Sequence, residues 1–156
     1  MKTNKQKIIS YVVIIASILL VAVLGSVFVN LGMDWFGSLN KPSEFVPNFI
    51  IPVMWTLIYG IFAVVLCLWV GNENLTTKTK VWLIINGVLQ VLWCLIFFTF
   101  NQTLLGLITI VLLLISAYIL IIDIYKQKPI YAYVCAIYPV WVSIATTLNL
   151  ALWILN

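Results

Sequence analysis

Long apolar stretches separated by short polar segments dominate the sequence. Charged residues are absent from residues 8–33, 45–72, 81–122 and 129–156. The third of these stretches has 42 residues, which is enough for two membrane-spanning helices of about 20 residues each. Its middle carries the polar run Asn101-Gln102-Thr103, so we predict a tight turn there. The pattern therefore predicts five transmembrane helices, at about residues 8–29, 50–70, 80–99, 104–124 and 131–154.

The connection between the first two predicted helices, residues 30–49, is longer than the others and rich in helix breakers. Its glycines and prolines predict a loop in place of a continuous helix. Loops of this length in compact domains are often binding loops or lids, although its aromatic residues could also be simple interfacial anchors. The candidate lid residues are Trp35, Lys41, Pro42, Ser43 and Pro47.

The composition indicates a chain surrounded by lipid. Apolar residues make up 65% of the 156 residues and charged residues only 8%, against about 45–50% and about 25% in ordinary soluble domains. Eight lysines and four acids cannot cover the surface of a soluble domain of this length. We therefore expect an all-α integral membrane protein, a single five-transmembrane-helix bundle over residues 1–156. The composition therefore excludes a soluble enzyme, a disordered tail and a disulfide scaffold.

The lysines predict how the bundle is oriented. Seven of the eight lysines lie at the amino terminus or in the second and fourth connections, which share one side of the membrane, and only Lys41 lies opposite. Because basic residues gather on the cytoplasmic side, we expect a cytoplasmic amino terminus and an external carboxyl terminus. The net charge of +4 forms no basic face, so nucleic acid is not an expected partner. The first apolar run exceeds the roughly 7–15 residues of a signal-peptide core and predicts a retained span.

The sequence offers few groups for acid–base or metal chemistry. Histidine is absent, and Cys67, Cys94 and Cys135 lie in different apolar stretches without a metal-binding spacing. We interpret the cysteines as small buried side chains and expect neither a metal site nor a required cofactor. Asp123 lies at the end of a predicted span, and no charged residue lies near the centre of one. This argues against a proton relay, a voltage sensor and an ion-coupled pump.

Aromatic and amide side chains recur at helical spacing in three predicted helices. Spacings of three or four residues place them on one face of each helix: Trp55 and Tyr59; Asn86, Gln90, Trp93 and Phe97; and Trp141, Ala145, Asn149 and Trp153. One interpretation is helix–helix packing with hydrogen bonds between helices. The other is a pocket for a planar apolar ligand, with aromatic walls and a few polar groups. Ala145 would then leave room for a ligand, or for the ring of an Ala145→Phe variant.

A longer ordered pattern resembles a known family. The run Trp35-Phe36-Gly37-Ser38-Leu39-Asn40-Lys41-Pro42-Ser43 is followed by Pro47, Pro52, Trp55 and Tyr59, then by Gln90, Trp93 and Phe97-Phe98, and finally by Trp141 and Ala145-Thr146-Thr147-Leu148-Asn149. This combination resembles the TspO/MBR family, the tryptophan-rich sensory proteins of bacteria, which are related to the mitochondrial translocator protein (peripheral benzodiazepine receptor). The length and the five-span layout agree, so the resemblance covers nearly the whole chain.

The resemblance implies a five-helix bundle with a pocket that opens toward the first loop. Family members bind porphyrins, and some bind sterols and benzodiazepine-type ligands. By position, the ligand-binding residues would be Phe36, Ile51, Trp55, Tyr59, Gln90, Trp93, Cys94, Trp141 and Ala145. The chain departs from the family pattern at Glu44 and Val46 in the loop, at Gln90 in place of an asparagine, and at Thr109 in place of an acid.

Our leading hypothesis is a sensory or regulatory protein of the bacterial cell membrane that binds a tetrapyrrole such as free-base protoporphyrin. A metal-free macrocycle needs stacking surfaces and hydrogen bonds but no axial ligand, which agrees with the absence of histidine. The second hypothesis is light- and oxygen-dependent degradation of porphyrin, in which Trp55 and Trp141 would be the catalytic electron donors.

A third hypothesis is a porphyrin or sterol transporter, or a structural partner of other membrane proteins. The sequence shows no inverted repeat of the kind common in transporters. Small residues one turn apart, such as Ala22 and Ser26, could pack helices within the chain or in a homodimer.

Overall fold

The computed structural model describes residues 3–43 and 46–156, and most of them are helical. In chain order the helices are α1 (Asn4–Leu31), α2 (Met33–Ser38), α3 (Ile50–Asn72), α4 (Thr77–Cys94), the π-helical turn η1 (Leu95–Thr99), α5 (Thr103–Gln127), α6 (Pro129–Cys135) and α7 (Ile137–Leu155). In the part of the chain that the structure describes, five helical segments are long and apolar enough to cross a membrane: α1, α3, α4 with η1, α5, and α6 with α7. The five predicted spans and the all-α fold class are therefore confirmed.

Two predicted elements differ in detail from the structure. The first connection is not wholly irregular, because α2 begins directly after Gly32. The fifth predicted helix consists of α6 and α7, which are separated at Ala136. Pro139 has no N–H group to donate to the carbonyl of Cys135, which accounts for a break at this position.

The predicted turn at residues 101–103 is confirmed. Asn101 has a φ of 58°, in the left-handed region that asparagine adopts more readily than most residues. Thr103 then begins α5. At the start of α4, the Thr76 hydroxyl accepts a hydrogen bond from Thr79 N (3.2 Å) and caps the helix.

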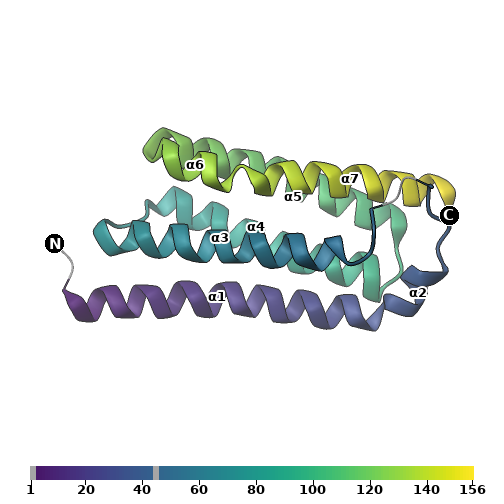
Figure 1. The fold of residues 1–156 in the computed structure, drawn as a ribbon, viewed down its shortest axis with the longest axis horizontal. Helices are drawn as coiled ribbons and strands as arrows, with labels where there is room; N and C mark the ends of the chain where they lie inside the picture. The colour runs from purple at the N-terminus through teal and green to yellow at the C-terminus, as the bar shows by residue number, and fades with distance from the viewer. Residues whose placement is uncertain (1–2, 44–45) are drawn as a thin grey trace.

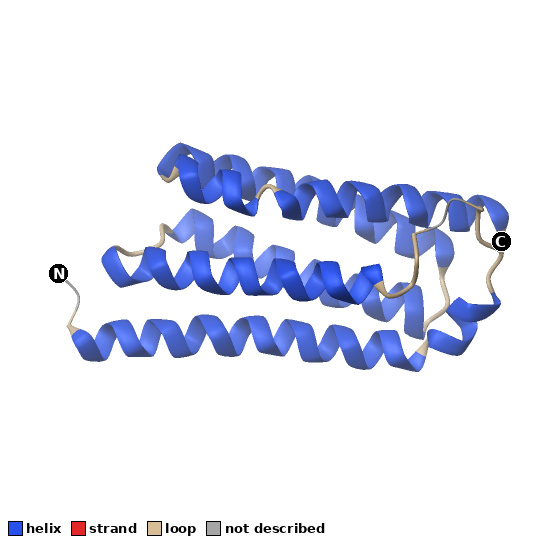
Figure 2. Cartoon of the chain, in the orientation of Figure 1, coloured by secondary structure: helices blue, strands red, loops and turns tan. Residues whose placement is uncertain are grey.

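The long helices lie side by side along the long axis of the molecule (Figure 1). Helices α4 and α7 pack along α5, α1 packs against α3 and α4, and α3 in turn meets α6 and α7. The beginning of α1 and the α3–α4 and α5–α6 connections lie at one end, whereas α2 and the C-terminus lie at the other (Figure 2). We call the first end the lysine-rich end, because it carries Lys5, Lys7, Lys78, Lys80, Lys126 and Lys128.

A buried polar cluster fastens α4 to α5 at the lysine-rich end. The carboxylate of Asp123 is buried and accepts hydrogen bonds from the Thr79 hydroxyl (2.8 Å) and the Gln127 amide (3.1 Å). Lys78 forms an ion pair with the same carboxylate at 3.3 Å. Because a buried carboxylate is costly unless it is paired and hydrogen-bonded, these contacts make Asp123 compatible with the core.

We predict that Thr79→Val destabilises the protein by about 1–3 kcal/mol, since it removes the hydroxyl that donates to the buried Asp123 carboxylate. Thr77→Val is the matched control, because Thr77 lies in the same helical turn but is exposed; a change within about 0.5 kcal/mol is expected there. Unfolding in detergent, followed by circular dichroism, measures both values. Equal stabilities of the two variants would contradict the role assigned to Thr79.

Candidate ligand-binding site

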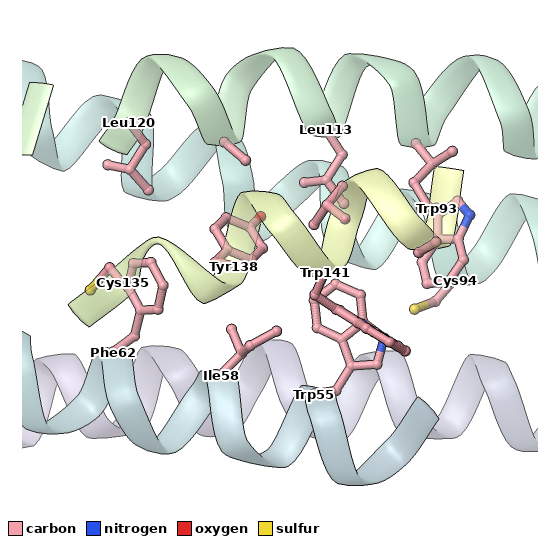
Figure 3. Close-up of a cluster of buried hydrophobic side chains, with 14 of the residues drawn as sticks. Trp55, Ile58, Phe62, Trp93, Cys94, Leu113, Leu120, Cys135, Tyr138 and Trp141 are labelled. Carbon is pink, nitrogen blue, oxygen red and sulfur yellow. The ribbon is translucent and has the colours of Figure 1, made fainter. Parts of the chain in front are cut away.

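Aromatic rings from α3 and α4 meet in the interior of the bundle. Trp55 stacks on Tyr59 of the same helix, with ring centroids 6.0 Å apart, and lies 6.2 Å from the ring of Trp93 on α4. Tyr138 of α7 packs edge-on against Trp55 at 6.4 Å. Figure 3 shows Trp141 extending from α7 toward Trp55 on α3. The residues Trp55, Trp93 and Trp141 are 9%, 4% and 4% exposed, so none of them faces lipid.

The π-helical turn η1 extends this cluster toward α2. In an α-helix, successive side chains point about 100° apart, yet both Phe97 and Phe98 are buried, and both pack against Trp93 at 6.1 and 5.7 Å. Two glycines leave space for this turn. A Cβ at Gly32 would overlap the backbone of Phe98, and one at Gly106 would lie 2.6 Å from the Phe97 ring.

Helix α2 and the residues after it cover the cluster. Phe36 is buried and packs against Phe98 at 5.4 Å, while Trp35 packs edge-on against Phe97 at the same distance. The ammonium of Lys41 lies 4.3 Å from the centre of the Phe36 ring and donates to the Phe36 carbonyl (2.8 Å). Lys41 therefore holds the buried end of α2 in place.

Two asparagines join this cover to the end of α7. The backbone N–H of Asn40 donates to Asn156 Oδ1 (2.9 Å), and Asn156 Nδ2 donates to the Asn40 carbonyl (3.1 Å). Among the other predicted lid residues, Pro42 is half-buried, and Ser43 and Pro47 are exposed. Of the two loop residues that depart from the family pattern, Glu44 lies outside the described residues, whereas Val46 is partly buried and packs against the core.

A small cavity lies at the centre of these contacts. Its volume is about 30 Å³, and its lining residues are Phe36, Ile51, Trp55, Trp93, Phe97, Phe98, Trp141, Ala145, Leu148, Asn149 and Leu152. A volume of this size holds no more than a few water molecules. The polar contact in its wall is the Trp93 Nε1–H donating to Asn149 Oδ1 (3.2 Å). The buried Nε1–H of Trp141 has no hydrogen-bond partner among the described residues.

Six of the nine predicted ligand-binding residues line this cavity: Phe36, Ile51, Trp55, Trp93, Trp141 and Ala145. Tyr59, Gln90 and Cys94 do not line it. Cys94 faces α1, since its sulfur lies 3.4 Å from the Cβ position of Gly25, and the Gln90 amide is directed toward the same sulfur at 3.9 Å. Gln90 and Cys94 are therefore buried outside the lining, although they share a broad helical face with Trp93.

Sequence reasoning did not assign five of the lining residues to the site: Phe97, Phe98, Leu148, Asn149 and Leu152. The helical spacing places Phe97 on the same face as Trp93 and Asn149 on the same face as Ala145. This spacing could therefore have identified both residues as part of the site. Phe98 joins the lining only through the π-helical geometry. Thr109, the departure on α5, lies outside the lining and donates to the Leu105 carbonyl of its own helix (2.7 Å).

The chemistry of the site is that of packing and hydrogen bonding. Within residues 3–43 and 46–156, the lining contains no acidic or basic side chain. Among the described residues, no three His, Cys, Asp or Glu side chains come together as a metal site. What the cavity presents is broad ring faces, one unpartnered indole N–H and one amide.

The fold and this site define an all-helical, multi-pass membrane protein with a small aromatic cavity between its helices. Residues 13–154 match the model of the TspO/MBR family, so the chain belongs to that family.

Curated relatives span nearly the same length. The tryptophan-rich protein TspO of Archaeoglobus fulgidus is 28% identical over 153 residues, which cover 97% of this chain and 99% of the relative. The protein of the same name from Chlorobaculum tepidum is 27% identical, with 98% and 99% covered. Protein CrtK of Rhodobacter capsulatus is 29% identical over 126 residues, which are 78% of each chain.

The cavity volume changes the expectation for Ala145→Phe, because a phenyl ring cannot enter about 30 Å³ without displacing its neighbours. We predict a loss of about 1–3 kcal/mol of stability from overpacking, measured by thermal unfolding in detergent. Ile144→Phe places the same ring at a 41% exposed position one residue earlier and should change stability by no more than about 0.5 kcal/mol. An Ala145→Phe variant as stable as the parent would contradict this prediction, because it would show that the helices around Ala145 can separate without a loss of stability.

Proposed function

We propose that this TspO/MBR family protein is a tetrapyrrole-binding sensory protein whose ligand, free-base protoporphyrin or a close relative, occupies the aromatic cavity in an opened form. The observation that carries the proposal is the convergence of three buried indoles, Trp55, Trp93 and Trp141, from three helices on one cavity. Indoles offer broad apolar faces for stacking on a planar ligand and an N–H group for hydrogen bonding.

The polar groups of the lining suit a metal-free macrocycle. A buried donor without a partner costs about 1–3 kcal/mol, and the Trp141 Nε1–H is such a donor. A ligand that accepts a hydrogen bond at its pyrrole nitrogens or carboxylates would remove this cost. The Asn149 amide adds an acceptor that is already aligned by Trp93. Neither interaction requires an axial metal ligand.

The described structure is the closed form in this proposal. Small-molecule sites usually have volumes of about 300–1,000 Å³, roughly ten times the cavity volume or more. A macrocycle can enter only if helices move apart. Binding therefore selects an open form, and the difference between the two forms is a signal that a partner protein can read.

We infer that the bundle opens between α3 and α7. Helix α7 is hydrogen-bonded to α4 through Tyr138 and Asn86 (2.8 Å) and through Asn149 and Trp93 (3.2 Å). Its contact with α3 at the cavity consists of ring packing, such as that of Tyr138 on Trp55. Separating α3 from α7 leaves the α4–α7 hydrogen bonds intact, so it is the least costly way to enlarge the cavity.

Because α2 covers the cavity, we infer that the entrance lies at the end of the bundle opposite the lysine-rich end. Phe36 would leave the cavity when α2 moves. With the lysine-rich end on the cytoplasmic side, as the distribution of lysines favours, the entrance faces the outside of the bacterial cell membrane, and so does the carboxyl terminus.

We predict that Trp141→Phe lowers protoporphyrin affinity about tenfold, equivalent to about 1.4 kcal/mol, because it removes the free N–H and part of the stacking surface. The absorbance of the porphyrin reports binding to the detergent-solubilised protein without depending on the replaced indole. The parent protein should bind saturably at concentrations below about 100 μM, which corresponds to a binding free energy of about −5 to −6 kcal/mol.

Trp69→Phe is the matched control. Trp69 is also a buried indole whose Nε1–H has no partner among the described residues, but it packs on Tyr131 and lies outside the cavity lining. Its replacement should leave porphyrin affinity unchanged. Equal effects of the two variants, or no saturable binding by the parent, would contradict the proposal. Illumination of the complex separates turnover from binding, because a product that forms only in the presence of Trp141 would support the enzymatic hypothesis.

A further inference from the structure

A second concave surface lies far from the aromatic cavity, at the lysine-rich end. It is an open groove of about 460 Å³ between the beginning of α1 and the end of α3. Its lining residues are Lys7, Tyr11, Val64, Cys67, Leu68, Gly71 and Asn72. Apart from the lysine, the tyrosine hydroxyl and the asparagine amide, this lining is apolar or weakly polar.

The groove runs from the membrane boundary into the hydrocarbon layer. Lys7, Tyr11 and Asn72 lie at its outer end, and Val64 lies eight residues further along α3, or about 12 Å deeper at 1.5 Å per residue. The inner wall is open to the surroundings of the bundle, since Val64 is 60% exposed. An amphipathic molecule whose head lies at the boundary and whose chain follows α3 fits this arrangement.

The charge at the outer end favours an anionic head. Among the described residues, the two ion pairs that the structure forms use Lys78 and Lys128, so Lys7 has no carboxylate partner there. Lys7 is half-buried at the groove, whereas Lys5, two residues earlier on the same helix, is exposed. The Asn72 side chain donates to the Leu68 carbonyl (3.1 Å), which leaves a second amide hydrogen available.

Tyr11 shapes this end of the groove. Its hydroxyl lies 2.5 Å from the Cβ position of Gly71, so any larger residue at position 71 would displace the ring. With glycine there, the Tyr11 ring packs against α3, and Tyr11 lines the groove together with Lys7 and Asn72. Three groups that can donate hydrogen bonds to a phosphate therefore line the same end of an otherwise apolar groove.

We propose that this groove binds one anionic phospholipid of the surrounding leaflet. The lipid phosphate interacts with Lys7, Asn72 and Tyr11, and one acyl chain lies along Leu68, Cys67 and Val64. The anionic lipids of the cytoplasmic leaflet attract basic residues near the membrane surface, and the groove converts this general attraction into one defined site. The inference stands apart from the proposed tetrapyrrole site and does not depend on it.

The test is native mass spectrometry of the purified protein in a neutral detergent with added phosphatidylglycerol or phosphatidylcholine of identical acyl chains. The parent should retain one phosphatidylglycerol about fivefold more tightly than phosphatidylcholine, as expected for one lysine near the membrane surface. Lys7→Gln should abolish that preference. Lys5→Gln removes the same charge from the same helix outside the groove and should retain the preference.

A second pair of variants tests the acyl chain. Cys67→Phe fills the groove and should reduce retention of both lipids, whereas Val53→Phe, at a 57% exposed position on α3 outside the groove, should not. Equal losses in Lys7→Gln and Lys5→Gln would overturn the proposal, since they would indicate diffuse attraction. Equal retention of the two lipids by the parent would overturn it as well. A dimer that Cys67→Phe abolishes while lipid retention is unchanged would assign the groove to a second copy of the chain.

Discussion

The bundle depends on the rule that polar groups inside hydrocarbon must find partners within the protein. Three buried clusters follow this rule at three depths: Asp123 with Thr79, Asn86 with Tyr138, and Asn149 with Trp93. Each of them includes α4, and together they hold α4, α5 and α7 in one register. Helix α3 meets α7 by ring packing at the aromatic cavity. The hydrogen bonds therefore make α4, α5 and α7 the rigid part of the bundle, whereas α3 can separate from α7.

This division explains why an internal cavity of only about 30 Å³ is compatible with a binding function. Aromatic packing is extensive but weakly directional, so rings that contact one another in the closed form can contact a planar ligand instead. The cover formed by α2 is held by Lys41 and by the exposed Asn40–Asn156 pair. These contacts lie at the end of the bundle rather than in its hydrocarbon core.

The sequence predicted the elements that lipid contact determines. The five spans, the turn at Asn101 and the burial of Trp55 follow from hydropathy, from a polar interruption and from helical spacing. The π-helical turn could not be predicted, because it depends on how Phe97 and Phe98 fit against Gly106 of α5 and against Gly32 between α1 and α2.

The sequence also could not predict which of the candidate site residues line the cavity and which do not. Spacing and family resemblance identify a helical face, but they do not fix the rotation of α4 that directs Trp93 into the cavity and Cys94 toward α1. Tyr59 stacks on Trp55 but does not line the cavity.

The most direct test of the central claim is a structure of the protein with protoporphyrin bound. Our account predicts density for the macrocycle between Trp55, Trp93 and Trp141. It also predicts that α3 lies further from α7 than in the closed form, while the Tyr138–Asn86 and Trp93–Asn149 hydrogen bonds are kept. A macrocycle bound on the lipid-facing surface, with the aromatic cavity still closed, would contradict the account.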